Sequence, residues 1–232
     1  MPQPYSIFSD SNDYNGLSAK KLVGPNGPLT RWRQNHPNGD PVNWQLIDSD
    51  HSVLRRFRGG PFLVNQFEAP NAFELGQVYQ GQLDGFTGTV YRTGMHFGMN
   101  RPEYTTFMVF SIDTPKTVPR TEIRPAVFGD KFHAGFHGVK TGNVDFDRHF
   151  HVQTEDEAFS STLISPETMA FFQNDDLAQT LAVIFEGTTL STWNHLDVTK
   201  PSNDQYIRDY MSLLIDYLIR VLKSTPGQLW HP

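Results

Sequence analysis

The sequence predicts an α+β fold in which an antiparallel β-sheet, or a roll of about seven strands, is covered by two short helices and a long C-terminal helix. Two observations predict it. Residues 77–128 are rich in β-branched and aromatic side chains and are punctuated by turn residues, as in successive strands. Residues 207–221 instead carry apolar side chains at helical spacing. Strands and helices thus occupy separate blocks of the sequence, which is typical of this fold class.

Length and composition support a folded domain and exclude several classes. The chain has 232 residues, 38% hydrophobic and 13% aromatic, enough to close a core. It has no cysteine, which excludes disulfides, Cys-ligated zinc and thiol catalysis. A net charge of −6 argues against a partner that is a nucleic acid. No apolar run approaches the roughly 18 to 20 residues that cross a bilayer, and no secretory signal is present, so we expect a cytoplasmic protein.

The composition of residues 1–44 predicts an irregular lead-in, followed by a single domain formed by residues 45–232. This stretch holds six Pro, four Gly and six Asn, which interrupt helices and strands. It also contains large apolar side chains, Trp32 and Trp44 among them, that are costly to leave in water. We therefore expect parts of the lead-in to pack on the surface of the domain.

The charge is unevenly distributed along the chain. Residues 1–61 carry a net charge of +2 and residues 62–232 a net charge of −8. In the favoured interpretation, basic side chains near the N-terminus such as Arg31 and Arg33 form a solvated surface. The alternative is that they contact acidic groups, including those in the acidic half of their own chain.

A β-hairpin is predicted first. Residues 77–83 and 87–97 flank Asp84-Gly85-Phe86, and Asp-Gly is a strong turn signal because glycine reaches positive φ without strain. Two further strands are predicted at residues 104–112 and 121–128, separated by Pro115 and Pro119. Pro125 makes the second of these an edge candidate.

The next segment predicts a strand, two short helices and a second hairpin. Residues 146–152 form the strand, and Thr154 with Glu157 has the spacing of a capping box that starts the first helix. Ser165-Pro166-Glu167 predicts a helix at residues 166–173. The hairpin is formed by residues 180–185 and 188–193 around Glu186-Gly187.

The last helix is amphipathic and spans about five turns. Its apolar residues recur at i, i+3, i+4 and i+7, Asp216 and Arg220 stand four residues apart, and Pro226-Gly227 ends it. We expect its apolar face to dock on the sheet. Four strands, then three, then a capping helix is also the count of a pleckstrin-homology-like (PH-like) roll, which stays open as an alternative.

Several short strings of the sequence are notable together: Asn43-Trp44-Gln45, residues 52–62, residues 146–152 with Asp156 and Phe159, residues 163–166 and residues 190–193. They resemble a group of uncharacterised actinobacterial proteins, many of which carry membrane segments nearer their N-terminus. The resemblance runs loosely from about residue 43 to the end, and it implies architecture but no catalytic residues. This chain lacks the membrane segment, which suggests a soluble version carried by a phage or another mobile element.

A metal site is one functional hypothesis. Asp145, Asp147, His149 and His151 share one parity of the predicted strand, and carboxylates and imidazoles suit zinc or manganese. A regular strand would spread them over roughly 20 Å, too far for all four to reach one ion, and a half-exposed strand shows the same alternation. A metal-assisted hydrolase therefore remains an alternative, and no cofactor is expected.

The favoured hypothesis is a non-catalytic module that binds another protein, because no catalytic motif is present. Its expected contact surfaces are the lead-in and Gly-rich loops near residues 85–103 and 129–143, which carry aromatic side chains. A third hypothesis is recognition of an anionic lipid surface by a basic patch. The candidate binding residues are Phe86, Phe97, Phe132 and Phe136 in the loops and Arg55, Arg56 and Arg58 in the basic patch.

Overall fold

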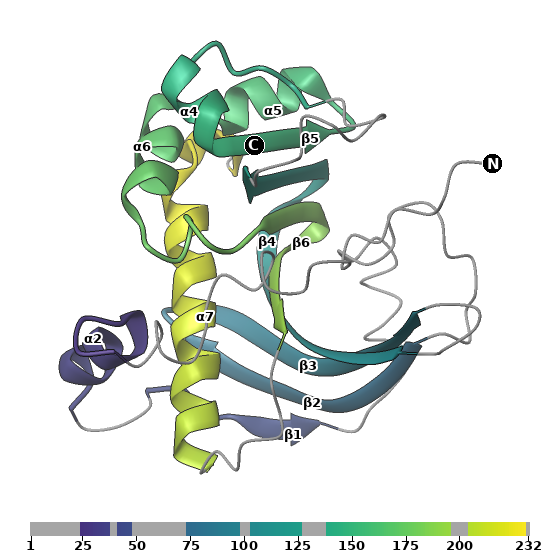
Figure 1. Cartoon of the computed structure of the whole chain (residues 1–232), viewed down its shortest axis with the longest axis vertical. Helices are drawn as coiled ribbons and strands as arrows, with labels where there is room; N and C mark the ends of the chain where they lie inside the picture. Colours follow the sequence, from purple (N-terminus) through teal and green to yellow (C-terminus); the bar gives the residue numbers. More distant parts are fainter. Residues whose placement is uncertain are drawn as a thin grey trace.

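The computed structural model describes residues 24–37, 41–47, 73–97, 103–126, 138–195 and 204–230, with backbone alone at 73–77, 92–97, 103–107, 195 and 204. Figure 1 shows a curved sheet with a long helix against one side of it and a group of shorter helices near one end. The elements in chain order are α2 (Pro28–Asn35), β1 (Gln45–Ile47), β2 (Phe73–Leu83), β3 (Phe86–Phe97), β4 (Glu103–Pro125), α4 (Val144–His149), β5 (Phe150–Thr154), α5 (Glu157–Leu163), α6 (Pro166–Asn174), β6 (Val183–His195), α7 (Asp204–Ser224) and the 3₁₀-helix η2 (Gly227–Leu229).

The predicted α+β class with an antiparallel sheet is confirmed. Within the described ranges six strands pair, in the order β1-β2-β3-β4-β5, and β6 pairs with β4. The first part of β4 lies between β3 and β6, and its last part lies between β5 and β6. Residues of both parts and of α7, α6 and α4 form the main hydrophobic core. The long helix α7 therefore packs in one core with both parts of β4.

The first hairpin is also confirmed. Asp84 and Gly85 have φ values of 51° and 81° and connect β2 to β3, the geometry of a two-residue type I′ turn. Phe86 belongs to the strand and pairs with Leu83, although the sequence placed it in the turn. The first strand of the hairpin also begins earlier than expected, at Phe73.

Two predicted strands form one. Residues 104–112 and 121–128 belong to the single strand β4, which has 23 residues, because Pro115 and Pro119 lie where the pairing with β6 shifts register. A residue outside the ladder needs no N–H donor, so a bulge tolerates proline. The edge position expected near Pro125 was wrong for residues 121–123, which pair with both β5 and β6.

The second predicted hairpin is instead one continuous strand. β6 pairs along its length with β4, and Gly187, with φ of 57°, stands opposite Val118 where the register shifts. The glycine therefore bends the strand and does not close a turn. After these two mergers, the part of the chain that the structure describes does not have the four and then three strands on which the PH-like alternative rested.

The strand predicted over residues 146–152 was wrong in its first half. Residues 144–149 form α4 and the strand β5 starts only at Phe150. The cause is local, since the Asn143 side chain accepts hydrogen bonds from the backbone N–H groups of Asp145 and Phe146, each 3.1 Å long. An N-cap of this kind starts a helix and holds it for one and a half turns.

The two short helices α5 and α6 are confirmed, with one change of cap. Asp156, and not Thr154, caps α5 by accepting a 2.9 Å hydrogen bond from the Phe159 N–H. Ser165 caps α6 as predicted, and Pro166 occupies its first position. The acidic residues 155–157 thus lie at a helix start, where the helix dipole favours negative charge.

The C-terminal helix α7 is confirmed, but its polar side is not simply solvated. Asp209 and Ser212 are buried, as are Tyr210 and Tyr217 on the apolar side. Part of the lead-in covers this polar side: Trp44 is buried and its indole N–H donates to the Ser212 hydroxyl. Among the described residues before β1, residues 28–35 form the helix α2, and the side chains of Leu29, Trp32, Val42 and Trp44 are buried.

Candidate interaction surface around helix α2

Helix α2 is positioned by two apolar side chains and by proline. Pro28 fills the first helical position, where its missing N–H is not needed. Leu29 and Trp32, three residues apart, are buried, and α2 contacts α7. The outer side of the helix carries the exposed residues Arg31 and Arg33. A short amphipathic helix thus lies across the polar side of α7.

Both arginines of α2 form ion pairs with the acidic half of the chain. Arg31 Nη2 donates to the exposed carboxylate of Asp176, and Arg33 Nε donates to Asp209 Oδ2 over 2.6 Å. The Asp209 side chain is only 7% exposed, and Gln205 Nε2 donates to its other oxygen. For these two residues the structure therefore has the alternative, pairing with the acidic part of the same chain, in place of the favoured solvated surface.

Arg220 of α7 forms a second set of polar contacts next to α2. Its Nε donates to Asp216 Oδ2 over 2.8 Å, its Nη1 donates to Asp175, and its guanidinium lies 5.8 Å from the Phe171 ring centroid. Burial lowers the pKa of Arg220, but the carboxylates of Asp175 and Asp216 outweigh that effect and keep the pKa above its usual value. The side chain is therefore firmly held in its charged form.

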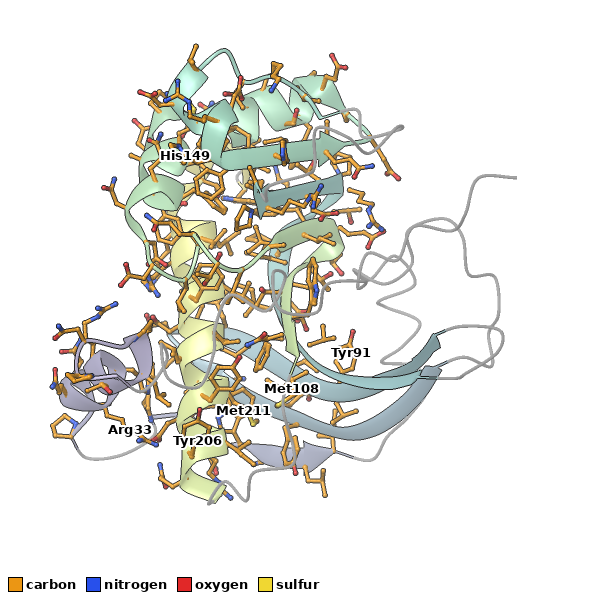
Figure 2. The ribbon with its side chains drawn as sticks, viewed as in Figure 1. Arg33, Tyr91, Met108, His149, Tyr206 and Met211 are labelled. Atoms are coloured by element: carbon orange, nitrogen blue, oxygen red, sulfur yellow. The ribbon has the colours of Figure 1, made fainter. Side chains whose placement is uncertain are left out.

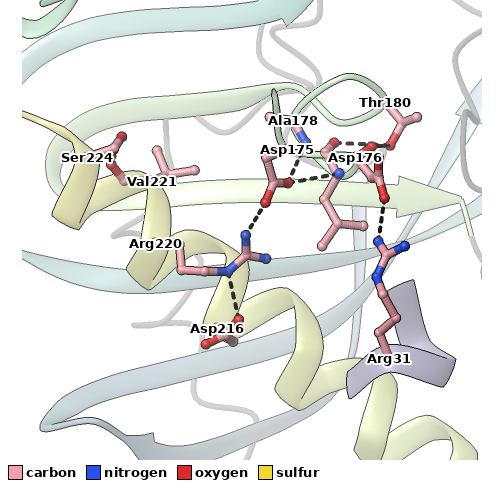
Figure 3. Close-up of polar contacts among 10 residues, drawn as sticks. Arg31, Asp175, Asp176, Ala178, Thr180, Asp216, Arg220, Val221 and Ser224 are labelled. Carbon is pink, nitrogen blue, oxygen red and sulfur yellow. Dashed lines mark hydrogen bonds and ion pairs between the residues drawn. The ribbon is translucent and has the colours of Figure 1, made fainter. Parts of the chain in front are cut away.

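The loop after α6 joins the two helices. Asp175 accepts from Arg220 of α7, and the next residue, Asp176, accepts from Arg31 of α2 (Figure 3). Asp175 Oδ1 also accepts the N–H groups of Leu177 and Ala178, at 2.9 and 3.1 Å, which fixes the loop backbone. Two consecutive aspartates thus connect segments that are far apart in the sequence.

Two hollows flank α2. The larger, about 370 Å³, is bordered by side chains of α2, α7 and the 175–177 loop, and the smaller, about 230 Å³, lies between the end of α2 and the start of α7. Trp32 and His36 border both, with their rings stacked at a centroid distance of 3.8 Å. We call the residues around the two hollows the α2 surface. The polar ones used below are Arg31, Arg33, Asp176, Gln205, Asp209 and Asp216.

The charged and ring groups of the α2 surface contact one another. Its arginines and the carboxylates they bind neutralise each other, and the His36 ring Nδ1 is engaged by the Trp32 carbonyl at 2.9 Å. The described residues that border the two hollows include no serine or threonine.

The proposed metal ligands do not converge. Asp145, Asp147 and His149 lie on α4, where Figure 2 labels His149, and His151 lies in β5. His149 Nδ1 contacts the backbone carbonyl of Asp145 at 2.8 Å, and Asp147 Oδ1 accepts from the Thr141 N–H and hydroxyl. Nowhere in the part of the chain that is described do three His, Asp or Glu side chains form a group able to hold an ion. The geometry gives the metal hypothesis no support.

Most of the predicted binding residues lie outside the described residues. This applies to Arg55, Arg56 and Arg58 of the basic patch and to Phe132 and Phe136. Phe97 is the last residue of β3, with only its backbone described.

Residues 86–97 were wrongly included in a Gly-rich contact loop, because they form β3. Within that strand Phe86 is partly buried and packs against the main core. Sequence reasoning missed α2, whose signal was Pro28 followed by Leu29 and Trp32 at helical spacing.

A second charged cluster is formed by residues of β4 and β6. Glu122 stands between Arg120 and Arg124 along β4, and Glu186 of β6 pairs with Arg120 at 3.7 Å. Burial raises the pKa of Glu122, and the two arginines only partly oppose it. Burial also raises the pKa of Glu186. Both carboxyl groups are therefore harder to ionise than in water.

Comparisons with known proteins give one distant likeness. No family model matches the chain, and no curated protein matches it. The crystal structure of the mycobacterial trehalose monomycolate transport factor A, TtfA, is similar at 10% sequence identity and a TM-score of 0.44, over 86% of this chain and 94% of that one. At that TM-score the likeness carries no argument about function. In the described part of the chain no helix, not even the 21-residue α7, combines the length and the apolarity needed to cross a membrane.

Proposed function

We propose that this chain is a non-catalytic module that binds another protein through the α2 surface. The observation that carries the proposal is the combination found there: a buried tryptophan at the boundary of two open hollows, surrounded by arginines and aspartates. Tryptophan and arginine are the residues most enriched at the energetic centres of protein interfaces, and a polar rim around an apolar floor is typical of them.

The alternatives are less well supported by the described residues. A metal-assisted hydrolase needs converging ligands, and the four candidates are dispersed over α4 and β5. Anionic lipid recognition rests on Arg55, Arg56 and Arg58, which lie outside the described residues. The α2 surface itself is poorly suited to an anionic membrane, because both arginines of α2 are paired with carboxylates.

The test uses Gln205, an exposed residue of α7 that lines the smaller hollow. A photo-crosslinking amino acid at this position should capture a partner from the host, and the same group at Ser161, exposed on α5, serves as control. The captured protein is identified, purified and titrated against Gln205→Arg and Ser161→Arg chains. We expect about a tenfold loss of affinity for Gln205→Arg only, because a bulky charge blocks the hollow. Equal affinities, or the same capture at both positions, would refute the proposed surface.

A further inference from the structure

Helix α2 depends on its contacts with the rest of the protein. An isolated helix of eight residues is far shorter than the roughly 12 to 15 residues that are marginal in water, so its helicity comes from docking. Leu29 and Trp32 are the buried side chains that anchor it, and the Arg31–Asp176 ion pair joins two side chains that are each about half exposed, where screening by water keeps an ion pair weak. Docking must also offset the conformational entropy that these eight residues lose when they become ordered. The helical state of α2 therefore depends on these contacts.

The surface beneath α2 is nevertheless specific. It offers two carboxylates, Asp176 and Asp209, on either side of an apolar position, and α2 fills it with Leu29, Arg31, Trp32 and Arg33. The hollows on both sides of Trp32 show that α2 leaves part of this seat empty. The seat thus accepts a helix with one aromatic anchor and basic residues beside it, and has room for larger side chains.

We propose that α2 is an internal occupant of a helix-binding seat on α7 and the 175–176 loop, and that a basic amphipathic helix of the partner protein displaces it. This inference rests on the proposed function and names the class of partner. Charge complementarity supports it, since α2 brings two arginines to a part of the chain with a net charge of −8 over residues 62–232. A segment with the same pattern but more apolar contact would bind more tightly than α2 does.

A competition experiment on the full chain tests the proposal. The probe is a fluorescent peptide with the sequence of residues 24–37, titrated into the wild-type chain and into Trp32→Ala, in which the internal α2 is weakened. We expect the peptide to bind the Trp32→Ala chain at least about tenfold more tightly, because it no longer competes with an intact α2. Addition of Asp209→Asn to Trp32→Ala should remove most of that gain, whereas addition of Asp145→Asn, at an exposed position, should not.

Equal peptide binding by wild-type and Trp32→Ala chains, or binding insensitive to Asp209→Asn, would overturn the proposal. Because Trp32→Ala can unfold, hydrogen exchange of the wild type is measured in parallel. The amides of α2 should exchange by a local opening that is faster than exchange in the middle of α7, and raising the salt from about 0.05 to 0.5 M should accelerate it. Exchange of α2 only together with α7 would refute a displaceable helix. The two proposals can fail separately. If a partner is still captured at position 205 but the peptide experiment gives the negative result, the proposed function stands and only the displacement of α2 is wrong.

Discussion

The indole Nε1 of Trp44 donates a 2.9 Å hydrogen bond to the hydroxyl of Ser212, in a position shielded from solvent. Trp44 belongs to the lead-in and precedes β1, while Ser212 lies on the polar side of α7. This bond connects residues 168 positions apart. It explains how a serine on the expected solvent side of an amphipathic helix becomes fully buried.

Ser212→Ala should lower the free energy of unfolding by about 1 to 3 kcal/mol, because it leaves the buried indole N–H without its acceptor. Urea unfolding followed by circular dichroism measures this. Trp44→Phe removes the donor, and the double variant should lose less than the sum of the two single losses. If the loss in the double variant equals the sum of the two single losses to within about 0.5 kcal/mol, the bond does not contribute to stability.

Two tyrosines of α7 should respond oppositely to loss of the hydroxyl. Tyr217 Oη is buried and has no hydrogen-bond partner among the described residues, whereas Tyr210 Oη accepts from Asn194 Nδ2 at 2.7 Å. Burial raises the pKa of both phenols, so both remain neutral. Tyr217→Phe should leave stability unchanged or raise it by about 1 kcal/mol, because an unsatisfied polar group is removed.

Tyr210→Phe serves as the matched comparison on the same helix. It should lower the free energy of unfolding by about 1 to 2 kcal/mol, since the buried Asn194 amide loses its acceptor. Thermal and urea unfolding of the two variants, measured side by side, give the two changes in the free energy of unfolding. A destabilised Tyr217→Phe would reveal a partner for that hydroxyl.

Gly88 is needed for the close approach of β3 and α7. A Cβ at this position would lie 3.0 Å from three side-chain carbons of Ile215. Gly88→Ala should therefore destabilise the protein by about 1 to 3 kcal/mol through overpacking. Gly227→Ala is the control, because a Cβ there meets nothing within 4 Å. Combining Gly88→Ala with Ile215→Ala should cost less than the two changes separately, and strict additivity would exclude a steric cause.

Glu122 should make stability fall as the pH rises. Its folded-state pKa is raised, chiefly by burial, so the folded protein binds the proton more tightly than the unfolded chain. The stabilising contribution is complete below the unfolded pKa of about 4.3 and is lost as the pH passes the folded pKa. Glu122→Gln should thus gain stability relative to wild type between pH 4 and pH 8. A difference between the two proteins that is constant over this range would contradict the assignment.

The periodic elements could be predicted from the sequence because their signals are local. The 207–221 pattern gave α7, Asp84-Gly85 gave the first turn and Ser165-Pro166 gave the start of α6. In each case neighbouring residues alone select the backbone conformation, through side-chain periodicity, positive φ or an N-cap.

Elements that depend on pairing partners were not predictable in the same way. Pro115, Pro119 and Gly187 normally end strands, yet here they lie at register shifts of two continuous strands, β4 and β6, that bend together. Whether such a residue breaks a strand or makes a bulge depends on the partner strand, which local sequence does not specify.

The sequence by itself determined the fold class, the main helices, the first hairpin and the opposite charges of the two parts of the chain. Only the tertiary structure decided that α2 forms, that Arg31 and Arg33 meet Asp176 and Asp209, and that Arg220 binds the neighbouring Asp175. These pairings join residues 45 to 176 positions apart. A helix as short as α2 acquires its stability from the surface on which it docks, so its existence and its candidate role follow from the assembled fold.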